Sequence, residues 1–404
     1  MKNSFAILSL SLFTVTSTLV TAADWPQWRG PDQNGISKET GWESLWPASG
    51  PKQLWKAQVG QGYSSFAVSK GRVFTTGNDK DQETIFCLDA NTGAEIWKHT
   101  FESKLDPKYY DGGTSATPTV DEGRVFTISK RGLVQCLDAS KGNLIWSKNL
   151  PNELKVKTPE WGFAGSVTVV GSNILLNVGT AGTMLEKQTG KVVWTSGTDV
   201  SGYSTPIIFD ANSERAALFM IKQDAIAVKT SDGKELWRAP WKVSYDVNAS
   251  DPILSGGKLF VSAGYNRGGA LFDVTVSPAK EIWQNKNMRN HFNPSVLIGG
   301  NLYGIDGDST KSDSALRCVD FQTGEIKWTE KTGFGALTAA DGKLIVLTSK
   351  GELMVANASP AGFKPISRTQ ALGGKSWTTP VLANGKIYCR NSAGQVVCID
   401  VSAK

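Results

Sequence analysis

Few residues in this sequence have the type and spacing that catalysis or metal binding requires. The 404-residue chain has only two histidines, His99 and His291, and its five cysteines form no Cys-x-x-Cys pair and no cluster with a histidine. His291, in the phrase RNHFNP, has no acid or nucleophile nearby in sequence, and no Ser-His-Asp order is present. Asp306, Asp308 and Asp313 resemble a calcium loop only loosely, so an ordinary hairpin turn is favoured there. We therefore predict no catalytic residue and no metal ligand.

Acidic residues instead recur in a phrase that the chain repeats. It reads CLDANTGAEIW at 87–97, CLDASKGNLIW at 136–146 and CVDFQTGEIKW at 318–328, with weaker copies at 184–194, 227–237 and 273–283. The acid can accept hydrogen bonds from turn amides, the glycine allows a positive φ, and the tryptophan can pack against a neighbouring sheet. We interpret the phrase as a folding device. Its residues are Asp89, Gly93, Trp97, Asp138, Gly142, Trp146, Gly190, Trp194, Gly233, Trp237, Trp283, Asp320, Gly324, Trp328 and Asp400.

The elements that carry this phrase are short strands. Each copy contains four strand-like runs separated by turn residues, and a repeat of 42–49 residues indicates a propeller or solenoid. Seven units are complete, and an eighth starts at Ser376 but stops after its third strand. The orphan run from Gln53 to Val59 can supply the missing strand. We therefore predict an all-β, eight-bladed β-propeller of four-stranded antiparallel blades over residues 51–404, closed by pairing of the two chain ends.

The N-terminal 50 residues have a different character. Residues 1–23 combine Lys2, an apolar run and a small-residue end, which predicts a signal peptide and an exported, periplasmic or extracellular chain without a transmembrane segment. Residues 24–50 are rich in Trp, Pro and Gly and predict an ordered strap. The formal charge of +6 includes no long basic run, which argues against nucleic acid as a partner. We expect a monomer.

The cysteines are predicted to be core residues. Four of the five occupy one position of the repeat, where Met184 and Ala227 stand in other copies, and a site that accepts Cys, Met or Ala is small and buried. Cys389 and Cys398 lie on two strands of one predicted hairpin, so a disulfide between them remains an alternative.

Candidate binding residues lie in the loops that enter the innermost strand of each blade. In a propeller these loops converge on the central channel, where aromatic and acidic side chains suit a planar ligand, a sugar or a peptide. The alternative is that the rings only shield the channel. The candidates for ligand or cofactor binding are Tyr63, Tyr110, Trp161, Tyr203, Trp241, Tyr245, His291 and Trp377.

The repeat also carries a family resemblance. The phrase DxxTGxxxW, complete at 89–97 and 320–328, resembles the repeat of the pyrroloquinoline-quinone (PQQ) propellers, and the opening WPQWRGPDQNGIS is similar to that of exported members. These are the eight-bladed quinoprotein alcohol dehydrogenases and their non-enzymatic relatives, which include the BamB outer-membrane assembly factor. The resemblance covers nearly the whole chain after residue 23, and it implies the fold more specifically than the activity.

For the dehydrogenases, the resemblance implies PQQ, a calcium ion held by Glu, Asn and Asp, an Asp base and usually a pair of adjacent cysteines. This sequence has no Cys-Cys pair, and Asp111, Glu160, Asp246, Asn248 and Asp251 could hold calcium only if their loops converge. We therefore expect a non-enzymatic binding or scaffold module for a protein or cell-envelope polymer. The alternative is a PQQ- and calcium-dependent alcohol or sugar dehydrogenase.

Overall fold

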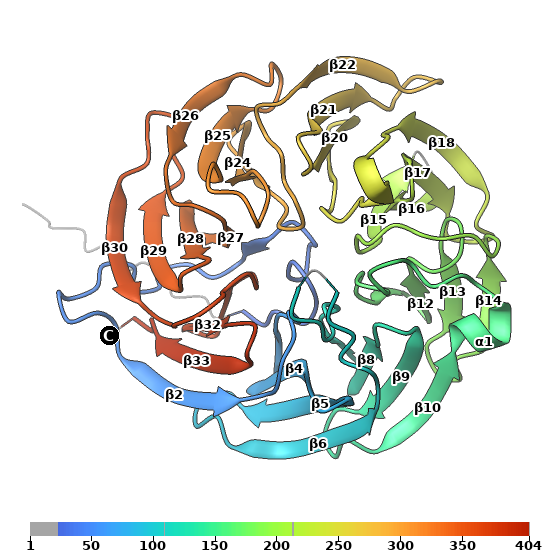
Figure 1. Ribbon diagram of the computed structural model, residues 1–404, viewed down its shortest axis with the longest axis horizontal. Helices are drawn as coiled ribbons and strands as arrows, with labels where there is room; N and C mark the ends of the chain where they lie inside the picture. Colours follow the sequence, from blue (N-terminus) through green and yellow to red (C-terminus); the bar gives the residue numbers. More distant parts are fainter. Residues whose placement is uncertain (1–22, 109, 212–213, 404) are drawn as a thin grey trace, which may run out of the picture.

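Eight sheets, antiparallel apart from the short strand β1, are arranged around a common axis like the blades of a propeller (Figure 1). The computed structural model describes residues 23–108, 110–211 and 214–403, so nearly all of the predicted signal peptide lies outside the described residues. We number the blades in chain order and give their strands from the channel outward. Blade 1 consists of β3 (Ala67–Ser69), β4 (Arg72–Asp79), β5 (Gln82–Asp89) and β6 (Glu95–Glu102), and blade 2 consists of β7 (Thr119–Asp121), β8 (Arg124–Ile128), β9 (Leu133–Asp138) and β10 (Leu144–Asn149). Blade 3 consists of β11 (Thr168–Val170), β12 (Asn173–Leu176), β13 (Thr183–Glu186) and β14 (Val192–Thr195). Blade 4 consists of β15 (Ile207–Ala211), β16 (Glu214–Met220), β17 (Asp224–Lys229) and β18 (Glu235–Pro240).

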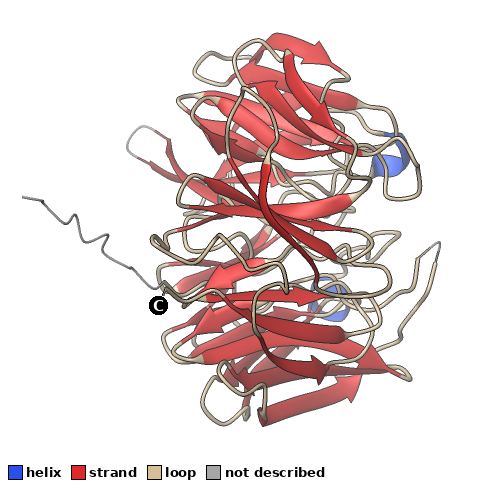
Figure 2. Cartoon of the chain, turned by 90° about the vertical axis from the view of Figure 1, so that its left-hand side faces the viewer, coloured by secondary structure: helices blue, strands red, loops and turns tan. Residues whose placement is uncertain are grey.

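The second half of the ring repeats this order. Blade 5 consists of β19 (Ile253–Ser255), β20 (Lys258–Ala263), β21 (Gly268–Asp273) and β22 (Lys280–Asn285). Blade 6 consists of β23 (Val296–Ile298), β24 (Asn301–Asp306), β25 (Ala315–Asp320) and β26 (Ile326–Glu330). Blade 7 consists of β27 (Gly335–Ala340), β28 (Lys343–Thr348), β29 (Glu352–Asn357) and β30 (Pro365–Gln370). The helices α1 (Leu150–Leu154) and η1 (Ser244–Asp246) lie on one side of the ring, in loops between blades (Figure 2). No helix in the described part of the chain is long and apolar enough to cross a membrane.

Blade 8 is built from both ends of the chain. Its inner strands are β31 (Val381–Ala383), β32 (Lys386–Arg390) and β33 (Gln395–Asp400), and its outer strand is β2 (Gln53–Gln58). β2 runs antiparallel to β33, with Trp55 opposite Cys398 and Ala57 opposite Val396. The predicted eight-bladed propeller and its closure are therefore confirmed.

The repeated phrase joins most neighbouring blades. Between blades 1 and 2, the indole Nε1 of Trp97 donates to the carbonyl of Ala139 at 3.0 Å, and a Cβ on Gly142 would stand 2.6 Å from the same ring. In the same turn the Asp138 carboxylate accepts the backbone N–H of Lys141 at 2.8 Å. The corresponding indole bonds join Trp55 to Ala90, Trp146 to Lys187, Trp194 to Thr230, Trp283 to Phe321 and Trp328 to Ser359. Acid, glycine and tryptophan thus form one junction between blades.

The five cysteines are buried and free. Cys389 lies opposite Val397, and Cys398 lies opposite Tyr388. Because paired residues share a face and neighbours alternate, the Cys389 and Cys398 side chains point to opposite faces of the blade. A disulfide between them does not form.

The segment 24–50 crosses the ring at the end of the channel away from the loops that enter the inner strands. The backbone of Trp25 exchanges two hydrogen bonds with Val68, and β1 (Ile36–Ser37) pairs in parallel with β27. Trp42 and Trp46 are buried in the core of blades 7 and 8. The segment is therefore an ordered strap that touches blades around the whole ring.

Candidate functional site

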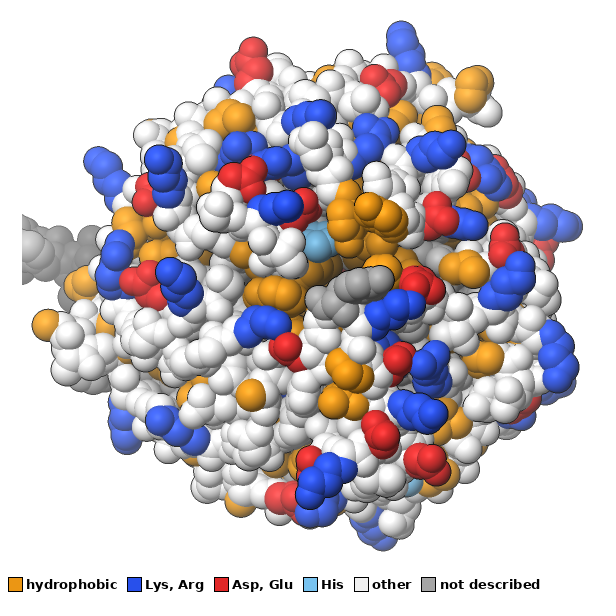
Figure 3. Space-filling model, viewed as in Figure 1, with side chains coloured by type: hydrophobic (Ala, Val, Ile, Leu, Met, Phe, Trp, Pro, Cys, Tyr) orange, Lys and Arg blue, Asp and Glu red, His pale blue; other side chains and the backbone are white. Residues whose placement is uncertain are grey.

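A cavity of about 990 Å³ occupies the centre of the ring. It appears in Figure 3 as a hollow edged by hydrophobic side chains. Seven of the eight side chains predicted for a channel site line this cavity, and each comes from a different loop. They are Tyr63, Tyr110, Trp161, Tyr203, Tyr245, His291 and Trp377.

Ring side chains form a continuous arc along the cavity wall. Neighbouring ring centroids in this aromatic arc are 4.8 to 5.7 Å apart, which is the normal distance for aromatic contact. The order along the arc is Tyr110, Tyr63, Trp377, Phe292, His291, Tyr265 and Tyr245. Each ring is held by its neighbours, so the wall is a preformed apolar surface.

Tyr245, at one end of the arc, is 75% exposed. Its backbone has φ 59°, and Asp246, Tyr265 and Asn266 also have positive φ values, between 53° and 58°. The two tyrosines contact each other edge to face at 5.3 Å. Such left-handed backbone is rare for a bulky residue and costs of the order of 1 kcal/mol or more. Two neighbouring loops therefore accept strain to hold tyrosines at the cavity.

His291 is a neutral side chain in this wall. Burial lowers the pKa of His291 to about 4, although the carboxylate of Asp308 acts in the opposite direction. The backbone N–H of Ser309 donates to Nδ1 at 3.2 Å. Because an imidazole nitrogen that accepts a hydrogen bond carries no proton, the bond assigns the proton to Nε2. At neutral pH, His291 is therefore a hydrogen-bond donor through Nε2.

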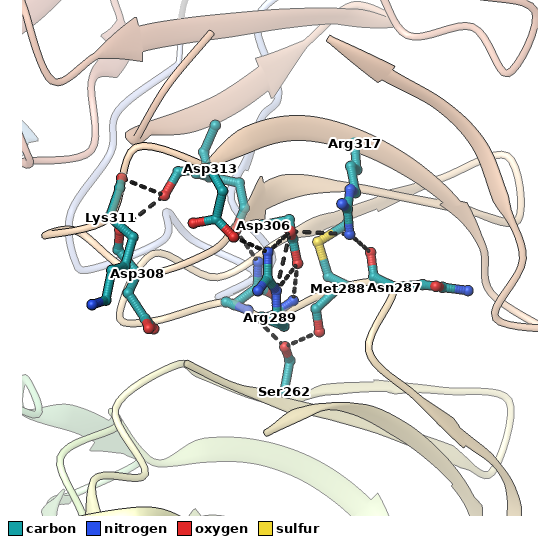
Figure 4. A network of polar contacts seen from close by, with 12 residues as sticks. Ser262, Asn287, Met288, Arg289, Asp306, Asp308, Lys311, Asp313 and Arg317 are labelled. Carbon is teal, nitrogen blue, oxygen red and sulfur yellow. Dashed lines mark hydrogen bonds and ion pairs between the residues drawn. The ribbon is translucent and has the colours of Figure 1, made fainter. Parts of the chain in front are cut away.

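A buried ion pair fixes the two loops that carry His291 and Ser309 (Figure 4). Asp306, which is fully buried, accepts three hydrogen bonds from the Arg289 guanidinium. Nε donates to Oδ1 at 3.0 Å and to Oδ2 at 3.2 Å, and Nη2 donates to Oδ2 at 2.6 Å. Arg317 lies 3.0 Å from the same carboxylate. The hydrogen bonds that Arg289 donates to Asp306 raise the pKa of Arg289 above its ordinary value. As predicted, this loop is a hairpin turn, and its first aspartate is a structural anchor.

Polar contacts hold the other end of the arc. Tyr63 donates its hydroxyl to Asp111 Oδ2 at 2.8 Å, and Lys375 Nζ lies 2.9 Å from both oxygens of Asp111. Burial is the main cause that raises the pKa of Tyr63, and its hydrogen bond to Asp111 is the second cause. Burial raises the pKa of Asp111, but the bonds from Lys375 and Tyr63 outweigh it and leave the pKa below its ordinary value. The same ammonium lies 4.7 Å from the ring centre of Trp377, so it also contacts the arc.

The strap contributes to the cavity through Trp28. Its indole Nε1 donates to Asp251 Oδ2 at 2.5 Å, and Thr205 N–H donates to Oδ1 at 2.8 Å. Arg29 Nε lies 4.0 Å from Asp251, and both side chains are almost completely buried. Burial lowers the pKa of Arg29 to about 10 against the pull of Asp251. Asp251, with both carboxylate oxygens hydrogen-bonded, and the indole of Trp28 therefore lie where the strap meets the cavity.

The placement of Trp241 at the channel mouth was wrong. Trp241 follows the last residue of β18 directly and is fully buried among apolar side chains of blades 4 and 5, with the Arg267 guanidinium 3.7 Å from its ring centre. Sequence reasoning missed Trp28 and Tyr265. Trp28 belongs to the strap, and Tyr265 belongs to the β20–β21 hairpin, which was not among the loops considered. The sequence signal that points to Tyr265 is the turn phrase GYNRGG at 264–269, which places an aromatic ring in a hairpin turn.

The oxygen donors do not fit the calcium ion that the dehydrogenase resemblance implies. Of the five residues considered for it, only Glu160 and Asp251 line the cavity. Glu160 is paired with Lys108, and Asp251 is bonded to Trp28 and Thr205. Among the described residues, no group of three or more His, Cys, Asp or Glu side chains could hold a metal ion. Calcium needs six to eight oxygen ligands, so we derive no chemistry through PQQ and calcium here.

Comparisons with known proteins agree with the resemblance. Among solved structures, the chain is similar to BamB from Moraxella catarrhalis, with 16% identity, coverage of 86% of this chain and 97% of that one, and a TM-score of 0.63. It is similar to quinohemoprotein alcohol dehydrogenase from Comamonas testosteroni, with 13% identity, coverage of 94% and 81%, and a TM-score of 0.70. The computationally designed protein Ika8 gives 12% identity, coverage of 89% and 100%, and a TM-score of 0.62. At these identities the likeness concerns the fold alone.

Sequence comparison identifies the family. No curated protein sequence matches this chain. The model of a family described as outer membrane protein assembly factor BamB matches residues 43–114 and 81–330, which is more than half of the chain. The chain therefore belongs to this family of PQQ-like β-propellers.

Proposed function

We propose that this chain is an exported binding propeller whose central cavity holds part of a protein or cell-envelope polymer without converting it chemically. The observation that carries the proposal is the cavity of about 990 Å³ with its preformed aromatic arc. Concave sites lined by aromatic side chains with a few polar groups are the usual form of a ligand site. The predicted signal peptide at residues 1–23 supports the exported location.

The ionisable groups at the cavity favour binding over reaction. A general acid or base must be free to exchange a proton with the ligand. His291 has its Nδ1 bonded to a backbone amide and is already neutral at pH 7, and Asp251 is bonded to an indole and an amide. Proton transfer at either group would break a buried hydrogen bond, whereas binding against the rings leaves these bonds intact.

A capture experiment with one surface variant tests the proposal. The purified wild-type chain without residues 1–23 is immobilised and exposed to a cell-envelope extract of the source organism. The variant Tyr245→Asn and the control variant Leu45→Ala are treated in the same way in parallel. Asn tolerates left-handed backbone, so the first variant removes the exposed ring at the cavity and little else. Leu45 is 67% exposed and lies outside the cavity lining. We expect material that is retained by the wild type and the Leu45 variant but lost from the Tyr245 variant.

Two results would refute the proposal. The first is equal retention by all three chains, or no retention. The second is reduction of a dye with an alcohol or sugar after reconstitution with PQQ and calcium, since that would establish the dehydrogenase alternative.

A further inference from the structure

We infer that the ligand of the central cavity is an uncharged carbohydrate chain. The inference rests on the proposed function and specifies its ligand. Three features of the cavity carry it: the rings, the balance of charge and the hydroxyl groups beside the rings.

The rings provide surfaces of the kind that sugars need. One face of a pyranose ring is a patch of C–H groups, which packs against the electron-rich face of an aromatic side chain, while the sugar hydroxyls at the edge need hydrogen bonds. Beyond the arc, Trp28, Trp161 and Tyr203 also line the cavity. Aromatic surface is thus present on several sides, which suits successive sugar units better than one small planar molecule.

The charges at the cavity disfavour a charged ligand. Three carboxylates line it, at Glu160, Asp251 and Asp308, and these would repel an anion. Two lysines, Lys108 and Lys311, also line it, so neither sign dominates.

Lysines also stand over the rings from outside the cavity lining. Lys130 Nζ lies 4.8 Å from the ring centre of Tyr110, and Lys375 Nζ lies 4.7 Å from that of Trp377. A cationic ligand on these rings would meet a positive charge already in place. Both signs of ligand charge are therefore opposed, and an uncharged ligand is favoured.

Hydroxyl groups beside the rings can bond the hydroxyls of a sugar. Ser166 Oγ accepts the N–H of Thr117, and Thr205 Oγ1 accepts the N–H of Ser166, each at 2.9 Å, which leaves the hydroxyl hydrogens to donate. Thr379 lines the cavity, is 8% exposed, and its Oγ1 has no hydrogen-bond partner among the described residues. The Oγ1 atom is almost fully covered, but within the described part of the chain it has no hydrogen bond to lose when the side chain turns toward a ligand in the cavity. The Nε2 proton of His291 adds a further donor.

An array of immobilised neutral and acidic glycans tests the inference. The chain without residues 1–23 is applied beside Tyr245→Asn, Thr379→Val and the control Leu45→Ala, and calorimetry then measures the Kd of the neutral glycan that is retained best. We expect neutral glycans to be retained, about tenfold weaker binding by each cavity variant, since 1.4 kcal/mol corresponds to a factor of ten, and an unchanged Kd for the control. Thermal unfolding of each variant separates lost binding from lost folding.

Each other outcome overturns the inference in a recognisable way. Retention of acidic glycans only, or equal binding by all variants, contradicts it. If no glycan is retained but an envelope protein binds in a Tyr245-dependent manner, the ligand is a peptide segment and the proposed function stands without this inference. If nothing binds in a Tyr245-dependent manner, the inference and the proposed function fail together.

Discussion

Glu83 in β5 should make the stability of this propeller fall as the pH rises. Its side chain is 1% exposed, and it lies directly opposite Asn78 in the β4–β5 ladder. Glu83 Oε2 and Asn78 Oδ1 are both buried without a hydrogen-bond partner in the described part of the chain. A proton on Glu83 gives the carboxyl group a donor that can serve this amide oxygen, whereas an ionised carboxylate adds a second unpaired acceptor.

The size of the effect follows from the pKa. Burial raises the pKa of Glu83 from 4.5 to about 7, and the hydroxyls of Thr114 and Ser103 offset only part of the rise. Below pH 4.5 the group is protonated in both the folded and the unfolded chain. Between 4.5 and about 7 only the unfolded chain loses the proton, so the free energy of unfolding falls by about 3 kcal/mol across this window and no further above it.

Denaturant unfolding of Glu83→Gln at several pH values from 4 to 8 measures the effect. The amide remains a neutral donor at every pH, so the variant should match the wild type near pH 4 and exceed its free energy of unfolding by up to about 3 kcal/mol at pH 8. Glu102→Gln, an exposed carboxylate on the adjacent strand β6, is the control and should keep the wild-type pH dependence. Parallel pH curves for the wild type and Glu83→Gln would refute the reasoning.

Three further predictions concern the strap, the blade junction and the thiols. Asp251→Ala should lower the free energy of unfolding by about 3–5 kcal/mol, because it leaves the buried guanidinium of Arg29 without its carboxylate partner. Urea unfolding measures this change, and a loss below about 1 kcal/mol would contradict the prediction. Gly142→Ala should lower the melting temperature at least twice as much as Gly123→Ala, since φ is 75° and 77° but only Gly142 lies under a tryptophan ring; equal losses would show that the ring contact is unimportant. The five thiols are buried, so a thiol reagent should label none in the folded chain and five in denaturant, and rapid labelling of the native protein would disprove their burial.

The fold was predictable because most junctions between blades are built from the same residues. A turn acid, a glycine and a tryptophan recur at several of them, so the period revealed the blades and the orphan run revealed the closure. The cavity was predictable only in part. Trp241 and Tyr245 lie four residues apart in one loop, yet the first ring is fully buried and the second is 75% exposed. Residue type does not encode that difference, which depends on the packing of neighbouring blades.

Contacts between distant segments were beyond sequence reasoning for a related reason. Trp28 and Asp251 meet across 223 positions of the chain, and no local pattern marks either as the partner of the other. Glu83 likewise looks like an ordinary strand residue in the sequence, and only its burial among uncharged neighbours changes its chemistry.

The pairing of β2 with β33 also sets an order of events in folding. β2 begins at residue 53, and its partner strand begins at residue 395, so its backbone groups stay unpaired until almost the whole polypeptide is available. Blades 1 to 7 need only strands that are neighbours in sequence, apart from the short β1, and each can form as its own chain segment appears. We therefore expect ring closure to be the last and slowest step, because it joins the most distant parts of the chain. Until that step, the outer edge of β33 stays unpaired, and an unpaired strand edge is a site where two copies of a chain can associate.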